Sequence, residues 1–235
     1  MPIIAQFFLV AIIAYLWGSI PAGYWMGLLL RGKDFDIRAY GSHKIGATNV
    51  LRTLGRGPAA VVFLFDLVKG IGPTLLALYV PFLYVGGWGP AIAGIAALLG
   101  HCFPIFIGFK GGRGVLTGAG ALLVISPGIF LLSAIVTFAT IAISRYVSLG
   151  SVLGSLSAAV FGLIFFFVNL AYPSFFIQVG LQQLLFLVVA PSLIIIFHYY
   201  NIGRLLSGTE RKIGQKVQIE EKPATPSNPS PNAST

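Results

Sequence analysis

Long apolar runs separated by short polar stretches dominate the pattern of this chain. Six such runs extend over residues 3–30, 59–83, 89–109, 115–144, 149–172 and 175–200. Each run has about 20 residues or more, the length that an α-helix needs to cross the hydrocarbon core of a bilayer. The pattern therefore predicts an all-α, polytopic membrane protein.

The placement of charge changes the predicted number of spans from six to seven. Of the 15 Lys and Arg residues, only Lys69 lies inside an apolar run. Short basic loops stay in the cytoplasm, so the loop 31–57, Arg145 and the basic C-terminal segment belong on one side. Six spans cannot satisfy this condition, whereas a break at the Ser-Pro-Gly sequence 126–128 can. We therefore expect seven transmembrane helices, with the N-terminus outside, the C-terminus cytosolic and one short helix near 115–126.

The short helix has a structural and an electrostatic consequence. Its 12 residues would be about 18 Å long, less than the roughly 30 Å of the hydrocarbon core. Neighbouring helices must therefore shield it from lipid. It begins directly after the loop 110–114, and helix N-termini attract anions.

Two segments are expected, a membrane domain over residues 1–213 and a cytosolic tail over residues 214–235. The tail is rich in Pro, Ser and Asn and lacks large apolar residues in its second half, which predicts disorder. No basic segment precedes the first apolar run and no small-residue cleavage site follows it. We therefore interpret Ile3 as the start of a retained span and not of a removable signal.

Composition supports the membrane assignment and argues against a soluble domain, a nucleic-acid-binding protein, a disulfide-bonded protein and a metalloprotein. Hydrophobic residues make up 57% of the 235 residues and charged residues 9%, against about 25% charged in soluble domains. The net charge of +9 is explained by topology, so no nucleic-acid partner is expected. The single cysteine, Cys102, excludes a disulfide within the chain. The three histidines are scattered and Asp34 and Asp36 form only a lone D-x-D, so we expect no metal and no cofactor.

The first polar island, residues 40–57, combines small residues with hydrogen-bond donors and cations. Its candidate phosphate-binding residues are Ser42, Lys44, Gly46, Thr48, Asn49 and Arg52. Such a loop can wrap a polyanion with backbone N–H groups and side-chain donors. It contains no Walker A motif. The alternative is an ordinary basic cytoplasmic loop.

The second and third islands place ionisable groups at or near membrane depth. Asp66 and Lys69 are three residues apart and share a helix face, either as part of a site or as a structural ion pair. His101 ends an apolar run and is either a packed, hydrogen-bonded residue or a group for acid–base chemistry. The loop after it supplies Lys110, Gly111, Gly112 and Arg113. We expect its glycines to let backbone N–H groups converge on a phosphate, with the two cations adding charge.

The fourth island closes the last apolar run. If the helix continues, His198, Asn201 and Arg204 step by three residues around one face. The alternative is that these residues anchor a helix end at the membrane surface. A weaker candidate is the stretch 145–151, where Arg145 is most simply a topology anchor.

These motifs together resemble a known family. The segments 41–52 (GSHKIGATNVLR), 100–112 (GHCFPIFIGFKGG) and 198–210 (HYYNIGRLLSGTE) resemble the three cytosolic motifs of the bacterial acyl-phosphate:glycerol-3-phosphate acyltransferases, the PlsY type. The stretches 66–70 and 147–149, the latter containing Ser148, are also similar to the family pattern. The resemblance covers about residues 1–213.

The resemblance implies seven membrane helices, an extracellular N-terminus and a cytosolic active site in the bacterial inner membrane. It implies acyl transfer from acyl phosphate to the 1-hydroxyl of glycerol 3-phosphate, giving lysophosphatidic acid for phospholipid synthesis. The expected partners are thus acyl phosphate, glycerol 3-phosphate and the lipid bilayer. The His-x4-Asp pair of other glycerol-phosphate acyltransferases is absent, because Thr48, Phe106 and Gly203 stand five residues after the three histidines.

The chain departs from the family pattern at three positions. The usual Gly-Ser-Gly-Asn becomes Gly-Ser-His43-Lys44, and the usual Lys-Gly-Gly-Lys-Gly has Arg113 as its second cation. These changes retain or add positive charge, so they leave the preference for anions intact.

Two phosphates brought together require several cations, which explains why several basic islands would converge on one site. We assign Ser42, Thr48, Asn49, Arg52, Lys69 and the loop 110–113 to the phosphates, with His198, Asn201 and Arg204 positioning glycerol 3-phosphate. The proton acceptor stays open among His101, His198, Asp66, Glu210 and an oxygen of a substrate phosphate.

Two other functions compete with acyl transfer. An anion transporter or channel with a cytosolic phosphate site would explain the intramembrane ionisable pair and the broken span, although no internal repeat is present. A lipid-phosphate transferase using Mg²⁺ would need more acidic residues than this chain offers.

Overall fold

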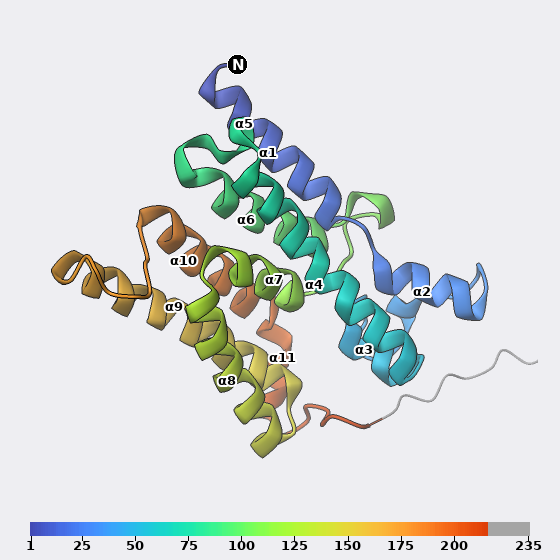
Figure 1. Ribbon diagram of the computed structural model, residues 1–235. Coiled ribbons are helices and arrows are strands. Elements are labelled where there is room, and N and C mark those ends of the chain that lie inside the picture. Colours follow the sequence, from blue (N-terminus) through green and yellow to red (C-terminus); the bar gives the residue numbers. More distant parts are fainter. Residues whose placement is uncertain (216–235) are drawn as a thin grey trace, which may run out of the picture.

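The computed structural model describes residues 1–215, and within them the regular structure is entirely helical (Figure 1). The α-helices are α1 (Ile3–Gly18), α2 (Ala22–Arg31), α3 (Ala47–Thr53), α4 (Arg56–Tyr79), α5 (Pro81–Tyr84), α6 (Trp88–Cys102), α7 (Val115–Ile125), α8 (Pro127–Ser144), α9 (Val147–Ala171), α10 (Leu181–Phe197) and α11 (Tyr199–Leu206). Three short 3₁₀ helices, η1 (Ile37–Ala39), η2 (Val85–Gly87) and η3 (Ile105–Ile107), lie in the connections. The all-α prediction is confirmed. Most of the predicted tail, from residue 216 onward, lies outside the described residues.

Breaks in the apolar runs decide how many helices can cross a membrane. The break predicted at 126–128 is confirmed, since α7 ends at Ile125 and α8 begins at Pro127. The first run is also divided, into α1 and α2, just before Pro21. Five segments are long and apolar enough to span a bilayer, and a sixth follows if α10 and α11 form one span. The chain bends by 58° between α10 and α11, so the helix does not continue straight through His198 as we had considered.

The short helix α7 is packed closely against α4. A Cβ atom on Gly70 of α4 would lie 2.0 Å from the carbonyl oxygen of Thr117, and one on Gly120 of α7 would lie 2.2 Å from that of Leu67. The two backbones therefore touch, as small residues allow in membrane helix pairs. The Thr117 hydroxyl also donates a hydrogen bond of 3.0 Å to the carbonyl of Asp66. This packing places the N-terminal end of α7 beside the ionisable residues of α4.

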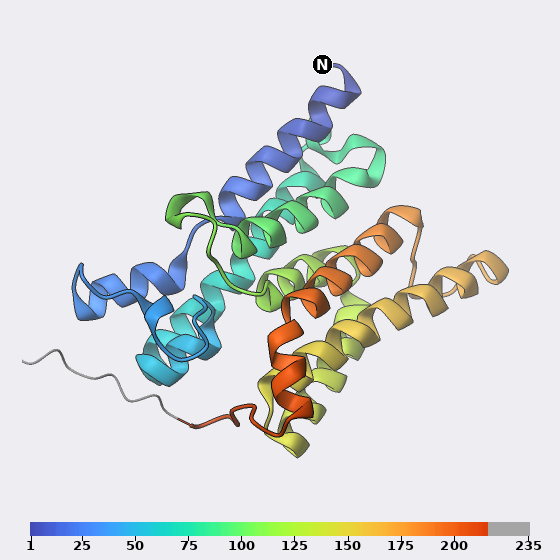
Figure 2. The same ribbon diagram turned by 180° about the vertical axis from the view of Figure 1, so that it is seen from behind.

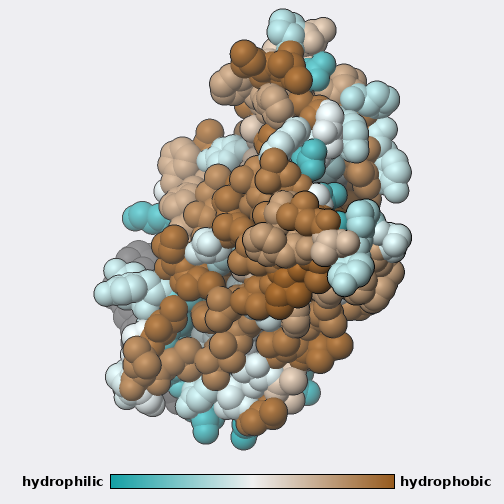
Figure 3. All heavy atoms as spheres, turned by 90° about the vertical axis from the view of Figure 1, so that its left-hand side faces the viewer, coloured by the Kyte–Doolittle hydropathy of each residue, from teal (hydrophilic) through white to brown (hydrophobic). Residues whose placement is uncertain are grey.

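Apolar side chains cover much of the outer surface. Figure 3 shows brown side chains over most of one face and polar groups mainly at its margins. Large apolar residues such as Leu29, Ile143 and Leu170 are more than 60% exposed. Such surface would be unfavourable in water and is what a lipid environment solvates. The protein is accordingly an integral, multi-pass membrane protein.

The basic loops meet at one end of the bundle, away from the N-terminus (Figures 1 and 2). Three hydrogen bonds join the loops directly: Arg38 Nη1 to the Ile107 carbonyl (2.8 Å), Arg211 Nη1 to the Gly41 carbonyl (2.9 Å) and Ile213 N–H to the Arg145 carbonyl (2.8 Å). Segments far apart in sequence thus form one polar layer. This layer holds the candidate site.

Candidate functional site

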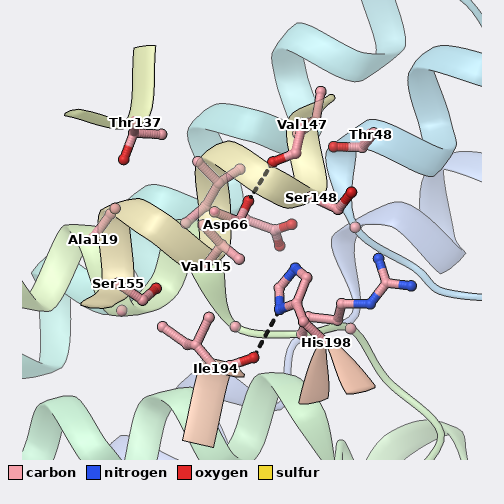
Figure 4. Close-up of a pocket in the computed structure, with 18 of the residues that line it drawn as sticks. Thr48, Asp66, Val115, Ala119, Thr137, Val147, Ser148, Ser155, Ile194 and His198 are labelled. Atoms are coloured by element: carbon pink, nitrogen blue, oxygen red, sulfur yellow. Dashed lines mark hydrogen bonds between the residues drawn. The ribbon is translucent and has the colours of Figure 1, made fainter. Parts of the chain in front are cut away.

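A cavity of about 320 Å³ connects the polar layer with the helices below it. Its polar wall is formed by Ser42, Lys44, Gly46, Thr48, Asn49, Arg52, Asp66, His101, Gly112, Arg113, Ser148, His198, Asn201 and Glu210. Its apolar wall includes Phe130, Phe138, Ile141, Phe186, Leu187 and Ile194, from α8 and α10. Figure 4 shows Asp66, Ser148 and His198 facing one another, with Ala119 and Ile194 toward the apolar part. The shape suits a ligand with a polar head and an apolar tail.

Asn49 folds the first loop and does not itself offer a free polar atom. Its Oδ1 accepts a hydrogen bond of 2.9 Å from the backbone N–H of Ser42. Its Nδ2 lies 2.7–3.2 Å from the carbonyl oxygens of Ile37, Tyr40 and Lys44. The amide is 1% exposed and fully occupied. It therefore positions the side chains of Ser42 and Lys44 at the cavity.

Asp66 and Lys69 form the ion pair that their spacing allowed. Lys69 Nζ lies 2.8 Å from Asp66 Oδ1 and also donates to the carbonyl of Ile20 at 3.0 Å. Both side chains are buried. His101 Nδ1 is 3.6 Å from the same carboxylate oxygen, too far for a hydrogen bond. Lys69 does not line the cavity; it joins α4 to the break between α1 and α2 and neutralises Asp66.

The glycines after His101 serve close packing. The N–H groups of Gly111 and Gly112 donate hydrogen bonds of 3.1 Å to the carbonyls of Cys102 and His101, at the end of α6. The prediction that these N–H groups converge on a phosphate is therefore wrong. A Cβ atom on Gly112 would lie 1.9 Å from His101 Nε2, so only glycine lets the loop approach the imidazole. Lys110 is exposed and lies outside the cavity.

Three cations in the cavity wall, Lys44, Arg52 and Arg113, form no ion pair with a carboxylate within residues 1–215. Burial lowers the pKa of all three, and that of Arg113 falls to about 10, so the guanidinium groups stay charged at neutral pH. The two carboxylates in the wall, Asp66 and Glu210, already have cationic partners. The cavity thus carries a surplus of positive charge that favours an anion.

Glu210 organises one side of the cavity. Its Oε1 accepts hydrogen bonds from Ser148 Oγ (2.9 Å) and Asn201 Nδ2 (2.8 Å), and its Oε2 accepts one from Arg204 Nε (2.7 Å). Burial raises the pKa of Glu210, but these three donors outweigh it, so the pKa lies below its ordinary value. The sequence identified Glu210 only as a candidate base, because nothing in the spacing revealed its contact with Ser148. Arg204 itself does not line the cavity.

His198 and Asn201 present hydrogen-bond acceptors to the cavity. His198 Nδ1 lies 2.7 Å from the carbonyl of Ile194. A carbonyl only accepts, so Nδ1 carries the proton and Nε2 is left as an acceptor. In Figure 4 this second nitrogen points into the cavity, toward Asp66. Asn201 donates its NH₂ to Glu210, and its buried Oδ1 has no partner in the described structure. These two acceptors complement the three cations.

Within residues 1–215, no group of three or more His, Cys, Asp and Glu side chains could hold a metal ion. Asp36, half of the D-x-D, instead pairs with Arg38 at 2.8 Å. Asp34 is exposed.

The family model and the most similar proteins named below are all glycerol-3-phosphate acyltransferases. Residues 8–208 match the family model described as glycerol-3-phosphate acyltransferase. The glycerol-3-phosphate acyltransferase of Desulforamulus reducens is 42% identical over 203 residues, which are 86% of this chain and 93% of that one. That of Thermoanaerobacter sp. is 41% identical over 212 residues, covering 90% and 98%.

Two crystal structures of PlsY (YgiH), an integral membrane glycerol 3-phosphate acyltransferase, share this fold at 36% sequence identity. The glycerol 3-phosphate form superposes with a TM-score of 0.76, covering 88% of this chain and 96% of that one. The lysophosphatidic acid form gives a TM-score of 0.73, covering 89% and 96%.

Proposed function

This chain belongs to the PlsY-type glycerol-3-phosphate acyltransferase family, and from this membership we propose how its cavity carries out the reaction. The protein is a membrane glycerol-3-phosphate acyltransferase of phospholipid synthesis. The proposal is that an acyl phosphate supplies the acyl group, that the 1-hydroxyl of glycerol 3-phosphate receives it, and that lysophosphatidic acid and inorganic phosphate leave.

The proposal rests on one cavity whose apolar wall continues into a wall with three cations that form no ion pair within residues 1–215. An acyl phosphate has the same division, with a long apolar chain and a dianionic head. Its chain fits between α8 and α10, near Phe138 and Phe186, and its phosphate fits among Lys44, Arg52 and Arg113. Ser42, Gly46 and Thr48 line the same polar end and contribute contacts to the phosphates.

Glycerol 3-phosphate fits the opposite side of the polar end. Its two hydroxyl groups are hydrogen-bond donors, and His198 Nε2 and Asn201 Oδ1 are the acceptors available to them. Glu210, fixed by Ser148 and Arg204, holds Asn201 in the orientation that exposes Oδ1. The Arg204 guanidinium, whose Nε donates to Glu210, adds positive charge near the acceptor phosphate from behind the cavity wall.

The reaction is an acyl substitution with balanced protons. The 1-hydroxyl oxygen bonds to the acyl carbonyl carbon, and the bond from that carbon to the bridging phosphate oxygen breaks. The departing phosphate would otherwise leave as a trianion, which is too basic to exist at neutral pH. The single hydroxyl proton therefore ends on the leaving phosphate. Asp66 and Glu210 are already neutralised by partners, so we propose that the leaving phosphate takes the proton directly while His198 and Asn201 orient glycerol 3-phosphate.

The cationic groups lower the barrier by neutralising charge that grows on the carbonyl and phosphate oxygens. Their positions are fixed before substrate binds, because Asn49, Gly112 and Glu210 hold the three walls in place. Donors oriented in advance stabilise developing charge more effectively than water, which must reorganise. Positioning two bound substrates removes the further entropic cost of their encounter.

Seven spans and a cytosolic site complete the proposal. Counting α7 as a short span adds one to the six segments formed by α1–α2, α4, α5–α6, α8, α9 and α10–α11. The polar layer at one end is the basic one, and basic loops stay in the cytoplasm. This orientation places the cavity mouth in the cytosol and the N-terminus outside the bacterial inner membrane.

The direct test incubates the purified full-length protein with acyl phosphate and glycerol 3-phosphate, with and without a metal chelator. Lysophosphatidic acid and inorganic phosphate are expected in equal amounts, unaffected by the chelator. Absence of lysophosphatidic acid would overturn the proposal. The competing function, anion transport, is tested with the protein reconstituted in vesicles. Movement of labelled phosphate across these vesicles, without acyl transfer, would support anion transport.

Alanine variants at His101, His198, Asp66 and Glu210 identify the proton acceptor. For His198→Ala we expect a loss of roughly 10- to 100-fold in kcat/KM, carried mainly by the KM for glycerol 3-phosphate. A loss of about 10³-fold in kcat with unchanged KM at any of these positions would instead indicate a protein base.

A further inference from the structure

The apolar part of the cavity ends inside the helix bundle, at side chains from four helices. These are Leu122 of α7, Phe130 of α8, Ala158 of α9 and Phe186 of α10, and all of them pack in one hydrophobic core. We propose that this closed end limits the length of the acyl chain to about 14 carbons, and that Phe186 sets the limit. The inference rests on the proposed function for the identity of the acyl donor. It goes further by naming the chain length that the protein prefers and the residue that determines it.

Helix geometry gives the length of this apolar part. Its lining extends on α9 from Ser148, at the polar end, to Ala158, and on α10 from Phe186 to Ile194, with His198 just after the helix. At about 1.5 Å per residue, the stretches 148–158 and 186–198 are roughly 15 and 18 Å long. An extended hydrocarbon chain advances about 1.25 Å per carbon, because its bonds of about 1.5 Å alternate in direction. The apolar part therefore takes about 12 to 14 carbons of a straight chain.

Phe186 is packed tightly at the far end of the cavity. Its side chain is buried, and a Cβ atom on Gly94 of α6 would lie 2.7 Å from its Cε2 atom, so the ring rests on the backbone of α6. Beside it, a Cβ atom on Gly162 of α9 would lie 2.9 Å from the Cβ atom of Leu187, so α9 and α10 approach closely there. A chain that reaches this end must displace close-packed side chains, which is unfavourable.

Beyond Phe186 the interior of the bundle becomes polar. A second cavity, of about 150 Å³, lies there, and its lining includes Tyr84, Gly87, Gln182 and Gln183. The two glutamines precede Phe186 by one helical turn on α10. A Cβ atom on Gly87 would lie 3.5 Å from the Tyr84 hydroxyl and 3.6 Å from Gln182 Nε2, so both polar groups adjoin this glycine. A hydrocarbon end placed here would separate amide groups from water, which costs free energy. The change in polarity thus reinforces the limit set by the ring.

The cavity wall near the polar end faces lipid. Phe63 of α4 and Phe138 of α8 line the cavity there and are also exposed on the outer surface. An acyl chain can enter from the bilayer on this side. A chain longer than the limit has to bend back toward Phe63 and Phe138, and it then loses packing at the closed end. We therefore expect activity to fall stepwise with each added carbon instead of stopping at one length.

The experiment compares Phe186→Ala with Phe165→Ala in the full-length protein. Both variants remove a phenyl ring from the same hydrophobic core, but Phe165 does not line the cavity. The kcat/KM is measured for a series of acyl phosphates of about 12 to 20 carbons. For the parent we expect a maximum near 14 carbons and a value about 10-fold lower at 18 carbons. Phe186→Ala should move the maximum to about 16 to 18 carbons, whereas Phe165→Ala should keep the profile of the parent.

Two further variants act in opposite directions at the same end. Phe186→Leu leaves a smaller space than Phe186→Ala and should lengthen the preferred chain by about two carbons. Ala158→Leu fills the end and should shorten the preferred chain by about two carbons. Thermal unfolding in detergent identifies any variant that fails to fold, and Phe186→Leu then replaces Phe186→Ala.

Binding of alkyl phosphates separates this inference from the proposed function, because these molecules carry the same two parts but cannot donate an acyl group. Titration calorimetry with the same chain lengths should show the same limit in each variant. A parent profile that does not vary with chain length, or one that Phe186→Ala and Ala158→Leu leave unchanged, would overturn the inference even if lysophosphatidic acid forms. A length limit in alkyl phosphate binding, without formation of lysophosphatidic acid, would refute the proposed function and leave the limit standing.

Discussion

Asn201 Nδ2 donates a hydrogen bond of 2.8 Å to Glu210 Oε1, and this contact fixes which end of the Asn201 amide faces the substrate cavity. A carboxylate only accepts, so the NH₂ group must face Glu210. The carbonyl oxygen is then left buried without a protein partner. In the proposed site, Glu210 thus turns a hydrogen-bond acceptor of Asn201 toward the cavity, where we propose that a substrate hydroxyl binds.

Replacing Asn201 with aspartate reverses this arrangement. Asn201→Asp puts two carboxylates in contact and adds negative charge where we propose that glycerol 3-phosphate binds. We expect kcat/KM for glycerol 3-phosphate to fall by roughly 100-fold or more, with a smaller effect on the KM for acyl phosphate. Steady-state kinetics with each substrate varied in turn measure this difference. Equal losses for both substrates would show that Asn201 does not act on the acceptor side.

Gly112 and Gly203 provide a matched pair of glycine substitutions. A Cβ atom on Gly112 would lie 1.9 Å from His101 Nε2, whereas one on Gly203 of α11 would meet nothing within 4 Å. Gly112→Ala should therefore displace the loop that carries Arg113 and reduce activity by about 10-fold or more. Gly203→Ala should retain activity, with stability raised by up to about 1 kcal/mol because alanine favours the helix. Turnover and thermal unfolding of both variants check the pair, and equal effects would contradict the packing argument.

Removing one member of the buried Asp66–Lys69 pair should destabilise the fold more than removing both. Asp66→Asn leaves the Lys69 ammonium buried without its anion, at a cost of about 3–5 kcal/mol. The double variant Asp66→Asn/Lys69→Met leaves no buried charge and should unfold at a higher temperature than Asp66→Asn. Unfolding in detergent, followed by tryptophan fluorescence, measures the three proteins. A double variant less stable than Asp66→Asn would mean that the hydrogen bond from Lys69 to Ile20 outweighs the charge effect.

Glu210 should give the protein a stability that depends on pH. Its pKa is lowered in the folded state, so its contribution is complete above the unfolded pKa of about 4.3 and is lost as the pH falls through the lower folded value. Glu210→Gln should therefore be less stable than the parent at pH 7, and the difference should shrink below about pH 4. Unfolding temperatures measured from pH 7 to pH 3 test this. A difference independent of pH would show that the hydrogen bonds, and not the charge, stabilise the contact.

Features of the fold that depend on neighbouring residues in the sequence were predicted, and features that depend on three-dimensional contacts were not. The break before Pro127 was predictable because proline removes a backbone donor and starts a helix. The Asp66–Lys69 pair was predictable because residues three apart share a helix face. The 58° bend after α10 was not predicted, because no proline or glycine lies there. At that point His198 directs its ring to the Ile194 carbonyl, and its own N–H is shared between two carbonyls of α10.

In the candidate site too, features set by neighbouring residues were predictable and contacts between distant residues were not. The basic islands predicted which segments would meet, since they gather hydrogen-bond donors and cations with few acidic residues. Which residues of these islands line the cavity and which only stabilise the loops was not predictable, because this depends on contacts with residues from distant parts of the chain. Ser148 and Glu210 are 62 positions apart, and no periodicity relates them. Asn49, expected to touch phosphate, uses all its polar atoms on the first loop.

The hydrogen bonds of Arg211 to the Gly41 carbonyl and of Ile213 to the Arg145 carbonyl bear on how the protein is made. Glu210, Arg211 and Ile213 follow every helix of residues 1–215, so a ribosome synthesises them after the spanning segments. Until then Asn201 has no carboxylate to orient its amide, and the loop at Gly41 lacks its tie to the other end of the chain. Nascent chains already inserted in the bilayer would therefore hold an unfinished acceptor site. The proposed acceptor side of the cavity is therefore completed only when residues 210–213, which follow all the helices of residues 1–215, have been synthesised.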